Sequence, residues 1–276
     1  MAMRVKLAYS PCPNDTFMFH ALINGLVDTE GIEFDVTLAD VEVLNENSIN
    51  NQYDVTKMSF HAFFYRKGLY SMLRCGSAFG IDGGPILVKR KDTLKIDYWK
   101  DKVVATPGAF TTGALLFYAE NGVCKKFEHM IFSNVEKAVL SGIVDAGVLI
   151  HEGRFTYKEK GLELIRDFGA DWKKRMKVPL PLGGIAVRKD LGIDFEAKMN
   201  RVLRRSIEYA IEHPGASIEY IAENAQEISE EVQHKHIDMF VNKYSLDWGE
   251  NGEKAVSTLC GIFESVKDLY VKDVLR

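Results

Sequence analysis

His151 directly follows an apolar run, Val-Leu-Ile, at the end of a predicted strand over residues 145–150. An imidazole with an unperturbed pKa of about 6.5 can accept or donate protons near neutral pH. Arg154 lies three residues later and could pair with a substrate carboxylate. The segment DAGVLIHEGRFTY (145–157) therefore indicates a general acid or base beside an anion-binding group, although a lone histidine is more often a packed or surface residue.

A second chemical segment, SPCPNDTFMFHAL (10–22), follows a predicted strand over residues 5–9. Pro11 and Pro13 fix the backbone angle φ and remove two amide donors. The amides from Asn14 onward would point outward at the start of a predicted helix, where they favour an anion such as a carboxylate. Asn14 adds a side-chain amide, and Asp15 is a plausible N-cap. The alternative is a structural turn with a well-capped helix.

A third segment, TPGAFTTGALLF (106–117), again runs from a predicted strand through a glycine-containing loop into a helix. Backbone amides with the hydroxyls of Thr111 and Thr112 suit a carboxylate or a sugar hydroxyl. The segment lacks the GK[ST] ending of a P-loop and the spacing of GxGxxG, so nucleotide phosphate binding is not indicated. The alternative is simple helix capping by threonine.

Lys57 and Ser59 lie at the carboxyl end of another predicted strand, over residues 53–58. Ligands of mostly parallel sheets bind at such strand ends. Lys57 could attract a carboxylate, or form a Schiff base if its pKa were unusually low.

The remaining histidines and cysteines predict no metal site. His234 and His236 are two residues apart on a predicted helix and do not share a face. His20 and His61 are more easily explained by packing. The sequence contains no HExxH, no GxSxG and no Cys/His cluster with ligand spacing, which counts against a hydrolase or a metalloenzyme.

Composition narrows the class of protein. Of 276 residues, 46% are hydrophobic and 27% are charged, and the net charge is −4, as in soluble globular proteins. Without a long basic run, neither nucleic acid nor an anionic membrane is an expected partner. The first residues lack the apolar core of a signal peptide, no stretch is apolar enough to span a membrane, and the four cysteines form no CxxC pair. We therefore expect a cytoplasmic protein with reduced thiols; its oligomeric state is not predicted.

Strands alternate with helices through the first 150 residues, which predicts α/β architecture with largely parallel sheets. Two similar segments, GGPILVKRKD (83–92) and LGGIAVRKD (182–190), suggest two strands by which the chain leaves one domain and later returns. We therefore expect a large domain of residues 1–90 and 184–276 and a smaller inserted domain of residues 91–183. One continuous sheet is the alternative. From residue 195 onward, helical spacing predicts four helices.

Five motifs together carry a family resemblance that spans nearly the whole chain. They are SPCPNDTFMFHAL (10–22), DVTKMSFHAF (54–63), VLIHEGRFTY (148–157), VPLPLGGIAVRKDL (178–191) and VNKYSLDWGENGEKAV (241–256). With these motifs the chain resembles the 1,4-dihydroxy-6-naphthoate synthases of the futalosine route to menaquinone.

The resemblance implies a two-lobed fold like that of type II periplasmic binding proteins, with mixed sheets, a central cleft and two crossover strands. It implies a lyase that converts cyclic dehypoxanthine futalosine to 1,4-dihydroxy-6-naphthoate with release of dihydroxyacetone, without a cofactor or metal. His151 would be the general base. The segments that resemble substrate-binding ones contain Lys57, Met58, Ser59, Thr111 and Thr112.

Two other functions remain open at this point. Chorismate dehydratase, of the same pathway and fold, would eliminate water from chorismate, and the SPCPNDTF opening argues against it. A non-catalytic cytoplasmic protein that binds a small carboxylate is the second alternative.

Overall fold

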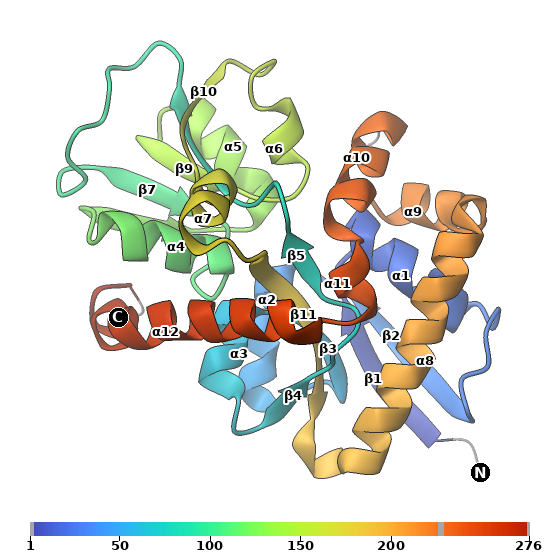
Figure 1. The fold of residues 1–276 in the computed structure, drawn as a ribbon. Helices are drawn as coiled ribbons and strands as arrows, with labels where there is room; N and C mark the ends of the chain where they lie inside the picture. Colours follow the sequence, from blue (N-terminus) through green and yellow to red (C-terminus); the bar gives the residue numbers. More distant parts are fainter. Residues whose placement is uncertain (1–2, 226–228, 275–276) are drawn as a thin grey trace.

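A computed structural model describes residues 3–225 and 229–274. These residues form two α/β lobes, each built around one sheet (Figure 1). Among the described helices, none has the length and apolar character that crossing a bilayer requires.

The first lobe contains a six-stranded sheet in the order β2-β1-β3-β11-β4, with β5 also paired to β11. β1 is parallel to β2 and β3, whereas β11 is antiparallel to each of its neighbours. The sheet is therefore mixed. Its strands are β1 (Met3–Tyr9), β2 (Ile32–Leu38), β3 (Val55–Ser59), β4 (Tyr70–Met72), β5 (Ala78–Gly80) and β11 (Leu180–Arg188).

Helices cover both faces of this sheet (Figure 1). The apolar residues of α8 recur at helical spacing and pack with those of α1 on one face, in a core that includes Phe19, Met199 and Leu203. The helices of this lobe are α1 (Pro13–Ile23), α2 (Val41–Asn47), α3 (Phe60–Arg66), α8 (Ile193–Glu212), α9 (Ile218–Asn224), α10 (Glu230–Phe240), α11 (Lys243–Leu246) and α12 (Gly249–Val274), with short 3-10 turns at Ser48–Asn50, Lys189–Leu191 and Pro214–Ser217.

The second lobe contains a five-stranded sheet in the order β10-β6-β9-β7-β8. β7 is parallel to β8 and β9, and β6 is antiparallel to β9 and β10. The elements are β6 (Ile86–Arg90), β7 (Val103–Thr106), α4 (Thr112–Asn121), β8 (Lys126–His129), α5 (Phe132–Leu140), β9 (Ala146–Leu149), α6 (Gly153–Thr156), β10 (Leu162–Asp167) and α7 (Phe168–Met176).

The chain crosses between the lobes after β5 and again before β11, and α12 contacts α3 of the first lobe and α4 of the second (Figure 1). The first crossing needs glycine. A Cβ on Gly169, at the start of α7, would lie 2.5 Å from the backbone carbon of Gly83 and 2.6 Å from the nitrogen of Gly84. The backbones therefore approach more closely than any side chain allows.

The predicted domain boundaries at residues 90 and 183 stay a prediction, and strand pairing bears on them. β6, up to Arg90, pairs within the second sheet, and β11, from Leu180, pairs within the first. The sheets thus favour boundaries a few residues earlier at both crossings.

The apolar run Met-Ile-Phe at residues 130–132 by itself predicts a short strand, and that prediction is wrong. β8 ends at His129, and Phe132 begins α5. Phe132, Val135 and Val139 are buried at helical spacing, so the apolar Met-Ile-Phe run is the start of a helix face. After residue 192 the described residues contain four helices of at least seven residues, as predicted, together with the short α11.

Candidate active site

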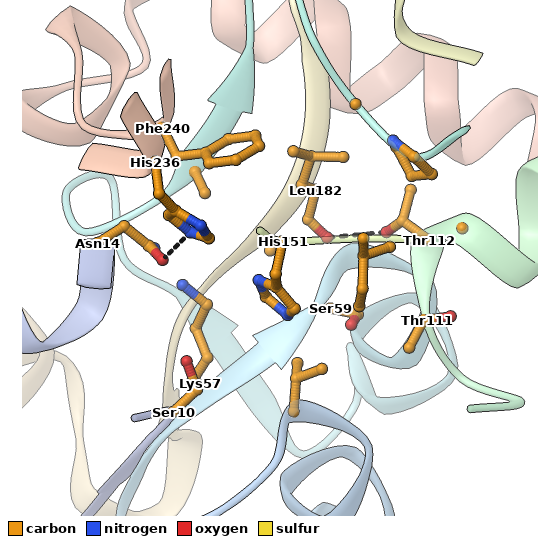
Figure 2. Close-up of a pocket in the computed structure, with 17 residues that line it drawn as sticks. Ser10, Asn14, Lys57, Ser59, Thr111, Thr112, His151, Leu182, His236 and Phe240 are labelled. Atoms are coloured by element: carbon orange, nitrogen blue, oxygen red, sulfur yellow. Dashed lines mark hydrogen bonds between the residues drawn. The ribbon is translucent and has the colours of Figure 1, made fainter. Parts of the chain in front are cut away.

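A cavity of about 80 Å³ lies between the lobes, at the ends of strands from both sheets (Figure 2). Polar groups converge in it from β1, β3, the loop before α4, the end of β9 and α10. The lining residues are Ser10, Asn14, Val41, Lys57, Ser59, Ala78, Gly84, Pro85, Thr111, Thr112, Gly113, Ile150, His151, Leu182, Gly183, His236 and Phe240. A largely apolar pocket with a few convergent polar groups is typical of a small-molecule site.

The elbow after β1 is organised around Asp15, whose side chain is fully buried. Its carboxylate accepts hydrogen bonds from Ser10 Oγ at 2.7 Å and Asn14 Nδ2 at 2.8 Å, and it pairs with Lys57 Nζ at 2.5 Å. The expectation that Asp15 is the N-cap is wrong, because the N-cap is Cys12. Two first-turn amides, of Asp15 and Thr16, donate to the Cys12 carbonyl, so they are not directed at a ligand. The buried anion at this elbow is Asp15 itself.

Strand alternation separates the three residues predicted at the end of β3. Lys57 and Ser59 face the cavity, and Ser59 Oγ accepts from Asn45 Nδ2 at 3.1 Å. Met58 is fully buried in the apolar core and is not among the cavity-lining residues. Because successive side chains of a strand point to opposite faces, Met58 cannot share the orientation of its neighbours, and we withdraw it as a substrate contact.

The two threonines line the cavity and are also engaged locally. Thr111 is the N-cap of α4; its Oγ1 accepts from the Ala114 amide and donates to the Gly108 carbonyl at 3.0 Å. Thr112 Oγ1 donates to the Leu182 carbonyl of β11 at 2.8 Å, which joins the lobes across the site (Figure 2). Capping and cavity lining, which the sequence left as alternatives, therefore coexist.

His151 follows β9 in a strained backbone conformation, with a φ of 54°. Non-glycine residues adopt this left-handed region uncommonly, and such strain concentrates at functional sites. The ring lies against Phe132, and its Nε2 is 3.8 Å from Cys12 Sγ. Burial lowers the pKa of His151 to about 4, an effect that nearby Asp15 opposes. The imidazole is therefore neutral at neutral pH, which is the form that can accept a proton.

His236, on α10, is a site residue that the sequence analysis set aside. It is 1% exposed, and its ring stacks on that of His151 with centroids 5.6 Å apart and planes 11° apart. Its Nε2 is 2.9 Å from Asn14 Oδ1 (Figure 2). Because the Asn14 amide nitrogen donates to Asp15, Oδ1 must be the acceptor, so His236 carries its proton on Nε2. Helix spacing gave no signal for this, because the partner is 222 residues away.

Arg154 does not line the cavity. Its guanidinium donates to both carboxylate oxygens of Asp167, at 3.2 and 2.7 Å, and to the Gly84 carbonyl at 2.9 Å. This bidentate pair already satisfies the group that was expected to bind a substrate carboxylate. We therefore withdraw Arg154 as a substrate ligand.

Solved structures with this architecture identify the fold. A crystal structure of an Archaeoglobus fulgidus protein is 35% identical, with a TM-score of 0.87 over 96% of this chain and 98% of that one. A Candida albicans protein described as having the generic periplasmic binding protein fold is 16% identical, with a TM-score of 0.69 over 98% and 94% of the two chains. The chain has a periplasmic-binding-protein-like fold, as the sequence predicted.

Sequence relatives narrow the assignment. The chain is 39% identical to a 1,4-dihydroxy-6-naphthoate synthase of Thermus thermophilus, over 92% of both chains. It is 36% identical to a Streptomyces coelicolor protein of the same name, over 92% of this chain and 91% of that one. The profile of a family described as menaquinone biosynthesis matches residues 5–265. The chain belongs to this menaquinone biosynthesis family.

Proposed function

We propose that this protein is a carbon–carbon lyase that converts cyclic dehypoxanthine futalosine to 1,4-dihydroxy-6-naphthoate and releases dihydroxyacetone. The names of its two curated relatives support the reaction. The observation that carries the proposal in this chain is the neutral imidazole of His151, held against a cavity between two lobes. A cytoplasmic location, which the four free cysteines favour, is part of the proposal.

In this mechanism the His151 imidazole removes a proton from the substrate, a carbon–carbon bond breaks, and formation of the aromatic ring supplies driving force. The resulting imidazolium then returns this proton to the departing three-carbon fragment, which leaves as dihydroxyacetone, and this transfer restores the neutral base for the next turnover. The Lys57 ammonium and the Ser59 hydroxyl face the same cavity and would orient a carboxylate and stabilise developing negative charge. Movement of the lobes would admit the substrate and then exclude water.

The test is His151→Asn. Asparagine adopts the left-handed conformation of position 151 readily, so the variant should fold, but it cannot accept the proton. General bases contribute about 10²–10⁴-fold, so we expect kcat to fall at least about 100-fold. Naphthoate absorbance during incubation with cyclic dehypoxanthine futalosine measures turnover. His234→Asn, on the exposed side of α10, is the matched control and should leave kcat unchanged.

Other outcomes would point to the alternatives. Near-normal turnover by folded His151→Asn protein would remove His151 as the base. Dehydration of chorismate in place of naphthoate formation would identify a dehydratase. Tight binding of the substrate without turnover would identify a binding protein.

A further inference from the structure

Three side chains that could ligate a metal ion meet beside the cavity. His151, Glu152 and His236 each offer one ligand atom, and these atoms all lie within 4.8 Å of one another. The carboxylate and one histidine come from consecutive residues after β9 in the second lobe, and the other histidine comes from α10 in the first. The spacing of histidines along α10 alone could not reveal this three-residue cluster, because two of its members lie after β9.

The tautomer of His236 determines what its second nitrogen can do. Since Nε2–H donates to Asn14, Nδ1 bears a lone pair. Nδ1 is buried, makes no hydrogen bond with the described residues, and lies 3.9 Å from Glu152 Oε2. A lone pair and a carboxylate oxygen that face each other are both acceptors, so a cation between them would be bound by both.

We propose that His151, Glu152 and His236 bind one Zn²⁺ ion, or a transition-metal cation of the same class, in the substrate-free protein, and that the bound ion blocks the general base. Two imidazoles and a carboxylate with an open fourth position form a common Zn²⁺ set, whereas Mg²⁺ and Ca²⁺ prefer oxygen ligands. Tetrahedral bonds of about 2.0–2.1 Å separate ligand atoms by roughly 3.4 Å, so side-chain movements of about 1 Å suffice.

The bound ion inhibits because the lone pair that ligates a metal cannot also accept a proton. The inhibitory part of the inference rests on the proposed function, whereas binding of the ion does not.

Binding is tested with Zn²⁺ alone by calorimetry, and with Co²⁺ by its visible absorption, on the full chain without substrate. We expect one ion per chain. Loss of groups that merely support a ligand lowers metal affinity about 10–100-fold, so Glu152→Gln and His236→Gln, which remove ligands, should weaken binding more than about 100-fold. His234→Gln, two residues from His236 and exposed, should bind as the wild type does.

Thermal unfolding checks separately that the variants fold. Without metal, each variant should unfold near the wild-type temperature. With Zn²⁺, only the wild type and His234→Gln should gain thermal stability. Glu152→Gln changes one atom and keeps the inference testable if His236→Gln does not fold. Unchanged affinity in Glu152→Gln, or no binding by the wild type, would overturn the inference.

Turnover assays separate this inference from the proposed function. Zn²⁺ should inhibit naphthoate formation by the wild type, and a chelator should restore it. The Zn²⁺ concentration that halves the turnover of Glu152→Gln should be more than about 100-fold higher than the one that halves the turnover of the wild type. Binding without inhibition would refute the blocking role. If the protein binds Zn²⁺ but forms no naphthoate after chelation, the proposed function fails and the metal site stands. If the protein forms naphthoate but neither binds Zn²⁺ nor is inhibited by it, only the metal site fails.

Discussion

At the residue scale, the Asp15–Lys57 pair places two opposite charges where water has almost no access. Asp15 is 0% and Lys57 is 5% exposed. Removing one partner of a buried pair leaves the other uncompensated, which costs about 3–5 kcal/mol. The Ser10 and Asn14 hydrogen bonds to Asp15 would offset part of that cost.

We therefore predict that Lys57→Met lowers the free energy of unfolding by about 3 kcal/mol, and that Asp15→Asn lowers it by a similar amount. The double variant should lose less than the sum, because neither charge then remains alone. Urea unfolding of the four proteins measures the coupling. Additive losses would show that the two charges do not interact.

A matched control is the exposed pair of Lys95 and Asp97. Lys95→Met should leave the urea midpoint unchanged, because exposed ion pairs contribute little.

The candidate site also shows which residues a sequence can identify. Four predicted residues lie near the carboxyl ends of strands or in the loops that follow them, and all four line one cavity: Lys57, Ser59, Thr111 and His151. Their roles in binding and catalysis stay predictions. His236 reaches the cavity only because α10 packs against α1, and a contact between distant helices leaves no local pattern. The role expected for Arg154 failed for a similar reason, since Arg154 lies in α6 and its partner Asp167 lies at the end of β10.

At the element scale, α2 of the first lobe holds the loop before α4 of the second. Glu42 Oε1 accepts from the Phe110 amide at 2.8 Å, and its carboxyl group packs against Gly108, whose positive φ and missing Cβ make room for it. Tyr270 of α12 donates to the Ala109 carbonyl of the same loop at 2.6 Å. Two elements therefore fix the loop that carries the site threonines.

Burial raises the pKa of Glu42 to about 7. The hydrogen bonds from Asn45 and Phe110 lower this pKa, whereas the nearby carboxylates of Asp40 and Glu46 raise it further. The folded chain therefore keeps a proton on Glu42 at pH values where the unfolded chain has lost it. The stability that this proton gives is complete below about pH 4.5, and it is lost as pH rises to about 7.

We predict that Glu42→Gln, which cannot ionise, becomes more stable relative to the wild type by about 3 kcal/mol as pH rises from 4.5 to 8. Urea unfolding at both pH values measures the difference, with exposed Glu159→Gln in the other lobe as the control that should not reproduce it. A difference independent of pH would mean that Glu42 is ionised in the folded protein throughout this range.

Prediction of the elements was most accurate where periodicity was strong. The apolar spacing of α8 and the buried strand β1 were predicted within three residues of their observed ends. β10 and α7 have no clear signal in the sequence. Leu162–Asp167 carries charges along an edge strand, and three of the last four residues of α7 are basic, so neither shows a continuous apolar pattern.

At the scale of the whole molecule, the lobes share a hydrophobic core. One cluster joins Phe60 of the first lobe, Leu115 and Val148 of the second, and Leu259 and Phe263 of α12. Because these residues lose contacts if either lobe unfolds, the lobes stabilise each other.

We predict one cooperative unfolding transition despite the two sheets. Trp172 lies in the second lobe, and Trp248 donates to Ser77 in the first. Fluorescence of variants that keep only one of these tryptophans should give the same urea midpoint as far-ultraviolet circular dichroism. Separate midpoints would show that the lobes fold independently.

The two-lobed fold was predictable because strand–helix alternation and the paired Gly-Gly segments are properties of the chain itself. The exact crossing points are less accessible from the sequence, because β6, inside the predicted large domain, pairs within the second sheet, and β11 begins at Leu180, a few residues before the predicted return at residue 184.

The left-handed backbone at His151 has a consequence for how such a protein could change over generations. A single base change in either histidine codon yields asparagine or aspartate, two residues that adopt this conformation more readily than most others. Loss of the base by that route would leave the cavity walls and both lobes undisturbed. One nucleotide therefore separates a catalyst of this design from a receptor that only retains its ligand.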